Sequence, residues 1–323
     1  MWLLSTDRAE LHHFVSPDQV LGGYAILSHV WDHQEQTFQE VQALSAQCTI
    51  LGGNPRDLVS PKVRACCILA ENHGHKWIWA DMCCINRESS AEISEAINSM
   101  YLYYSLSSVC YAYLRDVPGG YYSELFFQMS NSPFRSSIWH QRGWTLQELI
   151  APKIVLFLSQ DWKLLGTKAE LADLLHDITR VPVDVLRMQQ DPNTISVARR
   201  MSWAAGRKTT RIEDEAYSLL GLFGVSMTTC YGEGRDAFRR LQEEIMKRNV
   251  DTSLFAWGTG RFEQPLGASS SPLLARCRVH DNDLCYLLAP SPSSFADCHD
   301  IYYRAPRVRS APVSRSPATL CSY

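Results

Sequence analysis

The sequence has few charged residues and no excess of either sign. Its 323 residues include 31 Lys and Arg against 34 Asp and Glu, a formal net charge of −3 and a charged fraction of 20%. Binding to nucleic acid or to an anionic membrane surface usually needs a strong local excess of basic residues, so neither partner is expected. The hydrophobic fraction of 46% is typical of a globular chain and excludes disorder over most of its length.

The sequence also lacks a hydrophobic run long enough to cross a bilayer. Two stretches without a charged residue, 96–114 and 216–232, are rich in Tyr, Ser and Gly, whereas a spanning helix needs roughly 20 predominantly apolar residues. Only three apolar residues, Trp2 to Leu4, follow the first methionine before polar ones begin, too few for the core of a signal peptide. We therefore expect a cytoplasmic protein without a membrane span.

Metal-ligand and nucleophile motifs are missing as well. The 11 cysteines include the adjacent pairs Cys66-Cys67 and Cys83-Cys84, and no C-x-x-C or H-E-x-x-H occurs, whereas zinc ligands are normally spaced apart. An odd cysteine count without scaffold density favours buried, free thiols in a reducing compartment. Phosphate-loop and serine-hydrolase signatures are also absent, so we expect no metal.

Short apolar runs alternate with helical patterns in the first half of the chain. Strands are predicted at 24–28, 77–81, 108–114 and 153–159. Helices are predicted after Ser60-Pro61 and after Ser89, where N-cap residues precede apolar positions spaced three and four apart. This alternation predicts an α/β fold, a parallel sheet with helices on both faces, in which chemistry collects at the carboxyl ends of the strands.

The sequence divides into four parts. We expect an α/β domain over 1–160, a mainly helical region over 161–250, irregular or short extended pieces over 251–303, and a tail over 304–323. Within the helical region, Thr167 with Glu170 predicts a helix cap. The tail holds four Arg, three Pro, four Ser and no acidic residue, a composition that predicts disorder.

Polar and aromatic side chains gather at the predicted strand ends and in one short helical segment. The candidates are Ser28, His29, Trp31, Asp32, Asp81, Trp144 and Glu148. Because Trp144 precedes Glu148 by four residues, the indole can pack beside the carboxylate on one helix face and partly exclude water. A desolvated carboxylate has a raised pKa and strongly stabilises a nearby cation. The structural alternatives are an exposed helix glutamate, a strand-end turn and, at Asp81, a cap.

Three segments resemble the signature blocks of the HET domain, the fungal heterokaryon incompatibility domain. They are Tyr24 to Trp31 (YAILSHVW), Trp79 to Asn86 (WADMCCIN) and Arg142 to Leu149 (RGWTLQEL), in the family's order. Segments 196–203, 213–217, 231–234 and 288–292 resemble the region that commonly follows this domain. The resemblance implies a cytoplasmic effector of non-self recognition whose activation causes programmed cell death, with self-association and an upstream recognition protein as expected partners.

HET domains are more remotely similar to TIR domains, which have a flavodoxin-like parallel sheet. In TIR domains that cleave NAD, the catalytic glutamate follows a W-C-x-x-E type motif, and Trp144 to Glu148 matches it with threonine for cysteine. The loop after the first strand lines the nucleotide pocket in that family, and the segment 81–87 matches a loop used between neighbouring domains. Asp32 stands where the HET motif usually has glycine, and the stretch 115–142 is longer than in typical TIR domains.

The leading hypothesis is a cell-death effector that cleaves NAD at the nicotinamide–ribose bond and needs no cofactor. Glu148 would stabilise an oxocarbenium-like transition state, Trp144 would shape the pocket, and the residues at the strand ends would hold the ribose or phosphates. A second hypothesis is a non-enzymatic adaptor that self-associates through the helix 93–104 and an aromatic loop. That loop contains Tyr121, Tyr122, Phe126 and Phe127. The third is a metallohydrolase that uses the cysteines and histidines.

Overall fold

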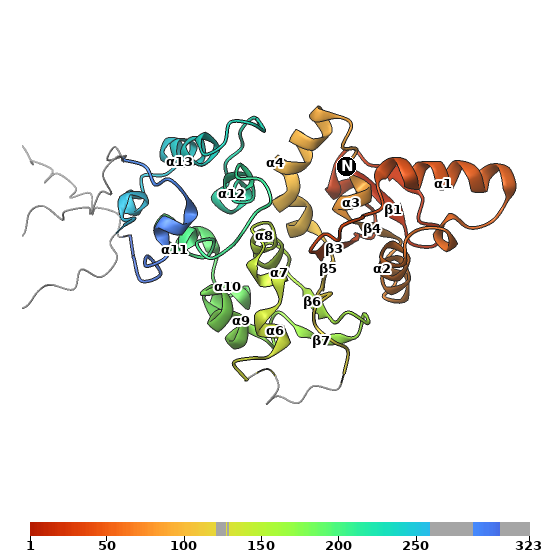
Figure 1. Cartoon of the computed structure of the whole chain (residues 1–323), viewed down its shortest axis with the longest axis horizontal. Helices are drawn as coiled ribbons and strands as arrows, with labels where there is room; N and C mark the ends of the chain where they lie inside the picture. The colour runs from red at the N-terminus through yellow and green to blue at the C-terminus, as the bar shows by residue number, and fades with distance from the viewer. Residues whose placement is uncertain (121–126, 128, 259–286, 304–323) are drawn as a thin grey trace, which may run out of the picture.

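The computed structural model describes residues 1–120, 127, 129–258 and 287–303 (Figure 1). These residues form a sheet of seven strands in the order β2-β1-β4-β3-β5-β6-β7. Its four central strands are parallel: β4 (Trp77–Trp79), β3 (Ala25–His29), β5 (Val109–Tyr113) and β6 (Val155–Leu158). Antiparallel strands extend both edges: β1 (Trp2–Ser5) with β2 (Leu11–His13) beside β4, and β7 (Leu164–Thr167) beside β6.

The four predicted strands are present, and the parallel α/β sheet is confirmed. Along the sheet, the parallel strands stand in the order second, first, third, fourth, which is the order of a flavodoxin-like sheet. The sequence patterns do not predict β1, β2 and β7, because strands of three or four residues carry too little alternation to be told from loops. β4 ends at Trp79, since Asp81 begins the short helix α3 (Asp81–Cys84).

Helices cover both faces of the sheet, as predicted. α1 (Phe38–Leu51) and α2 (Pro61–Asn72) lie on one side, and α4 (Ser90–Leu106) and α8 (Thr145–Ile150) lie on the other (Figure 1). Neighbouring residues of β3 point to opposite faces. Ser28 therefore contacts α8, whereas His29 approaches Lys62 of α2.

The helix starts follow the predicted capping chemistry in the first half. Ser60 and Ser89 are the N-caps of α2 and α4, and each hydroxyl accepts a hydrogen bond from a backbone N–H in the first turn. Thr167 and Glu170 also exchange hydrogen bonds. However, Thr167 is the last residue of β7, and the helix begins after Glu170, at Ala172.

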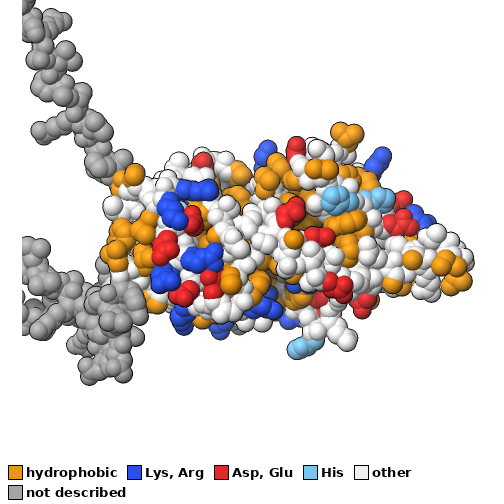
Figure 2. Space-filling view, turned by 90° about the horizontal axis from the view of Figure 1, so that it is seen from above, with side chains coloured by type: hydrophobic (Ala, Val, Ile, Leu, Met, Phe, Trp, Pro, Cys, Tyr) orange, Lys and Arg blue, Asp and Glu red, His pale blue; other side chains and the backbone are white. Residues whose placement is uncertain are grey.

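Beyond β7 the described residues form mostly short helices joined by irregular segments. The helices are α9 (Ala172–Thr179), α10 (Val183–Leu186), α11 (Val197–Ser202), α12 (Asp214–Tyr217) and α13 (Asp236–Arg248). Two further short helices, α6 (Pro133–Ser136) and α7 (Ile138–Gln141), precede α8. Around α11 to α13, the face in Figure 2 carries basic and acidic side chains intermingled, so this face has no extended field of one sign.

Some expectations fall outside the described residues. These are the predicted tail 304–323, residues 259–286 of the irregular segment predicted over 251–303, and three residues of the aromatic loop, Tyr121, Tyr122 and Phe126. The fourth, Phe127, packs edge-on against Phe134. Among the described residues, no helix has the length and apolar character that crossing a membrane requires.

The second half packs tightly against the sheet half at Gly221. This residue begins the 3₁₀ turn η4 (Gly221–Phe223), which lies against α4. A Cβ atom at Gly221 would overlap with the side chain of Tyr101 of α4. Only a glycine therefore allows the two backbones to approach so closely.

We expect Gly221→Ala to reduce the free energy of unfolding by about 1–3 kcal/mol, because the added methyl group must displace Tyr101 from the interface. The matched control is Gly206→Ala, where a Cβ would meet no atom within 4 Å and should change stability by less than about 0.5 kcal/mol. Urea denaturation monitored by tryptophan fluorescence measures both. Equal stability of the Gly221 variant and the wild type would contradict this packing.

Candidate functional site

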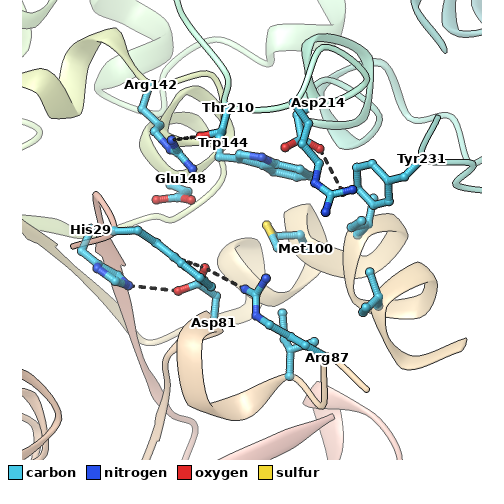
Figure 3. Close-up of a pocket in the computed structure, with 15 residues that line it drawn as sticks. His29, Asp81, Arg87, Met100, Arg142, Trp144, Glu148, Thr210, Asp214 and Tyr231 are labelled. Carbon is cyan, nitrogen blue, oxygen red and sulfur yellow. Dashed lines mark hydrogen bonds and ion pairs between the residues drawn. The ribbon is translucent and has the colours of Figure 1, made fainter. Parts of the chain in front are cut away.

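A pocket of about 260 Å³ opens beyond the carboxyl ends of β3 and β4 (Figure 3). β3 lies between β4 and β5, so the chain leaves it in one direction and later crosses to its other side. Ligands of open α/β sheets bind at such a switch in strand order. The predicted residues that line this pocket are His29, Trp31, Asp81, Trp144 and Glu148.

Glu148 sits at the inner end of this pocket, on a helix that is buried along its whole length. All six residues of α8 are buried, and Glu148 itself is 6% exposed. Its Oε2 atom accepts a hydrogen bond of 2.5 Å from the hydroxyl of Ser28. The hydroxyl of Tyr104, which donates a hydrogen bond of 2.9 Å to the Leu27 carbonyl, lies near the same carboxyl group. Two of the predicted site residues, 120 positions apart, are thus in direct contact.

The Ser28 hydroxyl has a fixed direction. Trp139 donates its indole N–H to Ser28 Oγ over 2.8 Å, which leaves the single hydroxyl proton for Glu148. Ser28 is fully buried and is absent from the pocket lining. It therefore supports Glu148 from behind instead of facing a ligand.

A half-buried arginine and a buried lysine hold α8 at its two ends. At its start, Arg207 donates hydrogen bonds to the Thr145 hydroxyl and to the Arg142 carbonyl, 2.9 and 2.8 Å long. At its end, Lys168 donates to the Leu149 carbonyl over 3.2 Å and to the Pro152 carbonyl. Burial lowers the pKa of Arg207 to about 9 and that of Lys168 to about 8. A cation at the carbonyl end of a helix is also favoured by the helix dipole.

The pKa of Glu148 is strongly raised. Burial lifts it from 4.5 to about 8; the nearby Asp81 carboxylate adds to the increase, whereas the Ser28 hydrogen bond and the charge of Arg142 oppose it. Desolvation penalises the charged form of a carboxyl group, and here it outweighs the opposing charge of Arg142. At neutral pH, Glu148 is therefore mainly protonated in the free protein.

Asp81 has the opposite electrostatic environment in the same pocket. Its carboxylate lies 3.0 Å from His29 Nε2 and accepts the indole N–H of Trp31 over 2.7 Å. Arg87 lies 3.8 Å away and stacks on the Trp31 ring at 4.0 Å. Burial raises the pKa of Asp81, but His29, Arg87 and Trp31 outweigh it, so that the pKa is lowered overall. Asp81 is thus the ionised partner of a protonated Glu148.

Asp32 lies outside the pocket lining. Its carboxylate forms ion pairs with Lys62, 2.5 Å away, and with Arg115. Burial raises the pKa of Asp32, yet these two cations lower it below its usual value. Its backbone does not have a positive φ angle, so the turn after β3 does not require the glycine usual in the HET motif.

The second half of the chain closes the pocket opposite β3 and β4. Thr210, Arg211, Asp214 and Tyr231 all line it. Asp214 accepts a hydrogen bond of 2.9 Å from the Tyr231 hydroxyl, and Trp144 lies close to the same carboxyl group. Burial raises the pKa of Asp214, and its polar neighbours Trp144 and Tyr231 partly oppose the rise. Asp214 thereby fixes the Tyr231 ring, which forms this wall together with Trp144 (Figure 3).

No role was predicted from the sequence for these four residues, nor for Arg87 and Arg142. The sequence nevertheless contained a signal for several of them. Arg142 begins the third block that resembles the HET domain, and the segments 213–217 and 231–234 resemble the region that follows HET domains. Their position in space depends on packing between distant segments, which no local spacing encodes. Among the described residues, no cluster of three or more His, Cys, Asp or Glu side chains could hold a metal ion.

Two family models match the chain. Residues 24–123 match the model described as Heterokaryon incompatibility protein (HET), and residues 236–318 match a domain of unknown function, DUF8212. The chain is also 39% identical over 234 residues to the Vegetative incompatibility protein HET-E-1 of Podospora anserina. That match covers 72% of this chain and 17% of the relative. No solved structure matches the chain significantly.

The HET match contains the first two signature blocks, at 24–31 and 79–86, and ends before the third, at 142–149. The HET model spans β3, β4 and β5 and includes His29, Trp31 and Asp81 of the pocket. The resemblance to the HET domain is confirmed, and this chain contains a heterokaryon incompatibility (HET) domain.

Proposed function

We propose that this chain acts in vegetative incompatibility and triggers cell death by cleaving NAD at the nicotinamide–ribose bond. Its HET domain and its similarity to a vegetative incompatibility protein support the biological role. The proposal of NAD cleavage rests mainly on one observation: the Glu148 carboxyl group lines a pocket, is buried there and accepts a hydrogen bond from Ser28.

The proposed reaction needs little more than a well-placed carboxylate. The bond between ribose C1′ and the nicotinamide nitrogen breaks, and its electron pair leaves with neutral nicotinamide. The ribose develops oxocarbenium character, as in other glycoside cleavage. Ionised Glu148 stabilises this cation in a water-poor site, where electrostatic effects are large. Water then bonds to C1′, releasing ADP-ribose and one proton.

The other pocket residues suit the nicotinamide ribose half of the substrate. Trp144 and Tyr231 offer aromatic surfaces for the ring, and the ionised Asp81 can accept hydrogen bonds from ribose hydroxyls. The pocket volume of about 260 Å³ lies just below the range of roughly 300–1,000 Å³ for small-molecule sites. It would take this half of NAD and leave the adenosine half at the surface.

Substrate charge couples to the protonation of Glu148. The nicotinamide ring of NAD is positively charged until its bond to ribose breaks. A cation beside a buried carboxyl group favours the ionised form and lowers its pKa. Substrate binding would therefore help to release the proton that Glu148 retains in the free protein.

We expect Glu148→Gln to reduce NAD turnover by at least about 100-fold, because it removes the charge that stabilises the transition state. The matched control Glu88→Gln makes the same chemical change at an exposed position and should retain full turnover. Chromatography of NAD, nicotinamide and ADP-ribose after incubation with concentrated purified protein measures both. Wild-type turnover by the Glu148 variant would remove this residue from the mechanism, and continued cell killing by it would favour a non-enzymatic adaptor.

The pH dependence should follow the free carboxyl group of Glu148. Since kcat/KM reports ionisations of the free enzyme, it should increase roughly tenfold per pH unit below pH 8 and level off above a pKa of about 8. Initial rates at low NAD concentration between pH 6 and pH 9 provide the profile. A profile that is flat, or that declines with increasing pH, would show that ionised Glu148 is not the active form.

A further inference from the structure

The pocket contains two arginines without an acidic partner. Arg87 is paired with Asp81, but within the described part of the chain no carboxylate lies within ion-pair distance of Arg142 or Arg211. Arg142 donates one hydrogen bond, 3.0 Å long, to the Thr210 hydroxyl. Arg211 stacks on the Tyr231 ring at 4.4 Å. Most of the N–H donors on these two guanidinium groups remain available to a ligand.

The pocket also carries more positive than negative formal charge. Three arginines line it, together with the carboxyl groups of Asp81, Asp214 and Glu148. Because Glu148 is mainly protonated at neutral pH, two negative charges at most oppose three positive ones, leaving His29 aside. The pocket is therefore positive overall and favours an anion.

Arg142 lies next to the proposed reacting centre. Its side chain points toward the Glu148 carboxyl group (Figure 3), and its charge lowers the pKa of that group. In a nicotinamide nucleotide the 5′-phosphate is attached to the same ribose whose C1′ atom Glu148 would face. A guanidinium group that reaches this ribose can hold a phosphate through two parallel hydrogen bonds.

We propose that Arg142, assisted by Arg211, binds the phosphate attached to the nicotinamide ribose. This subsite selects phosphorylated nicotinamide nucleotides over nicotinamide riboside. The inference rests on the proposed NAD cleavage for the identity of the ligand. The anion site itself follows from the unpaired arginines and the positive pocket.

The test is calorimetric binding of nicotinamide mononucleotide and nicotinamide riboside to the full chain. The wild type should bind the mononucleotide at least about tenfold more tightly than the riboside, as expected for a charge-assisted bidentate contact. Arg142→Gln should abolish this preference and leave riboside affinity within about twofold, while Arg142→Lys should restore it only in part. The control Arg239→Gln removes an exposed arginine of α13 and should preserve the preference.

Equal wild-type affinity for the two ligands would overturn the subsite, as would an unchanged preference in Arg142→Gln. Thermal unfolding shows whether Arg142→Gln folds. If it does not fold, the subsite is tested by the wild-type affinities for the two ligands and by Arg211→Gln. Arg211→Gln should weaken the preference, and an unchanged preference would remove Arg211 from the subsite. NAD hydrolysis is measured separately. A preference that Arg142→Gln abolishes, in a chain that does not hydrolyse NAD, would uphold the anion subsite and refute the proposed cleavage.

Discussion

The burial of one carboxyl group, that of Glu148, imposes the main physical constraint on this structure. Water is largely excluded from it by β3 and α8, and its hydrogen bond from Ser28 does not compensate fully for the lost hydration, so the pKa rises to about 8. Such a group opposes folding when it ionises. The surrounding structure must therefore hold α8 firmly, and Arg207 and Lys168 do so from its two ends. Each of these cations also loses hydration on burial.

The pocket depends on both halves of the chain. The HET model match ends at residue 123, before Trp144 and Glu148, and the opposite wall comes from residues 210–231. Asp214 of that wall lies close to Trp144, and Gly221 lets the same region approach α4. The sheet therefore positions Asp81 and His29, whereas the second half of the chain supplies the opposite wall of the pocket, including the charged residues Arg211 and Asp214.

Sequence reasoning succeeds where a signal is local. The strand β3 is continuous and buried throughout, and Ser60 and Ser89 cap the helices that they are expected to cap. The resemblance to TIR domains, and no local signal, implied that Glu148 and Trp144 share a site with the residues at the strand ends, and both line one pocket with Asp81. Sequence reasoning fails where distant segments meet. Asp32 follows the pocket residue Trp31 in the sequence, but its side chain is paired with Lys62 and Arg115 outside the pocket. No spacing in the sequence reveals that Asp214 and Tyr231 lie in the same pocket as Glu148.

The most direct test of this account is the difference in unfolding free energy between Glu148→Gln and the wild type as a function of pH. Below about pH 4.5, Glu148 is protonated in both the folded and the unfolded chain and contributes no pH dependence. Between pH 4.5 and pH 8 the unfolded chain releases this proton while the folded chain retains it. The unfolding free energy of the wild type therefore decreases as the pH rises through this range. The unfolding free energy of the variant should therefore rise relative to that of the wild type across this range, and the difference should reach a plateau above pH 8. A difference that is independent of pH would show that Glu148 is not held protonated in the folded protein.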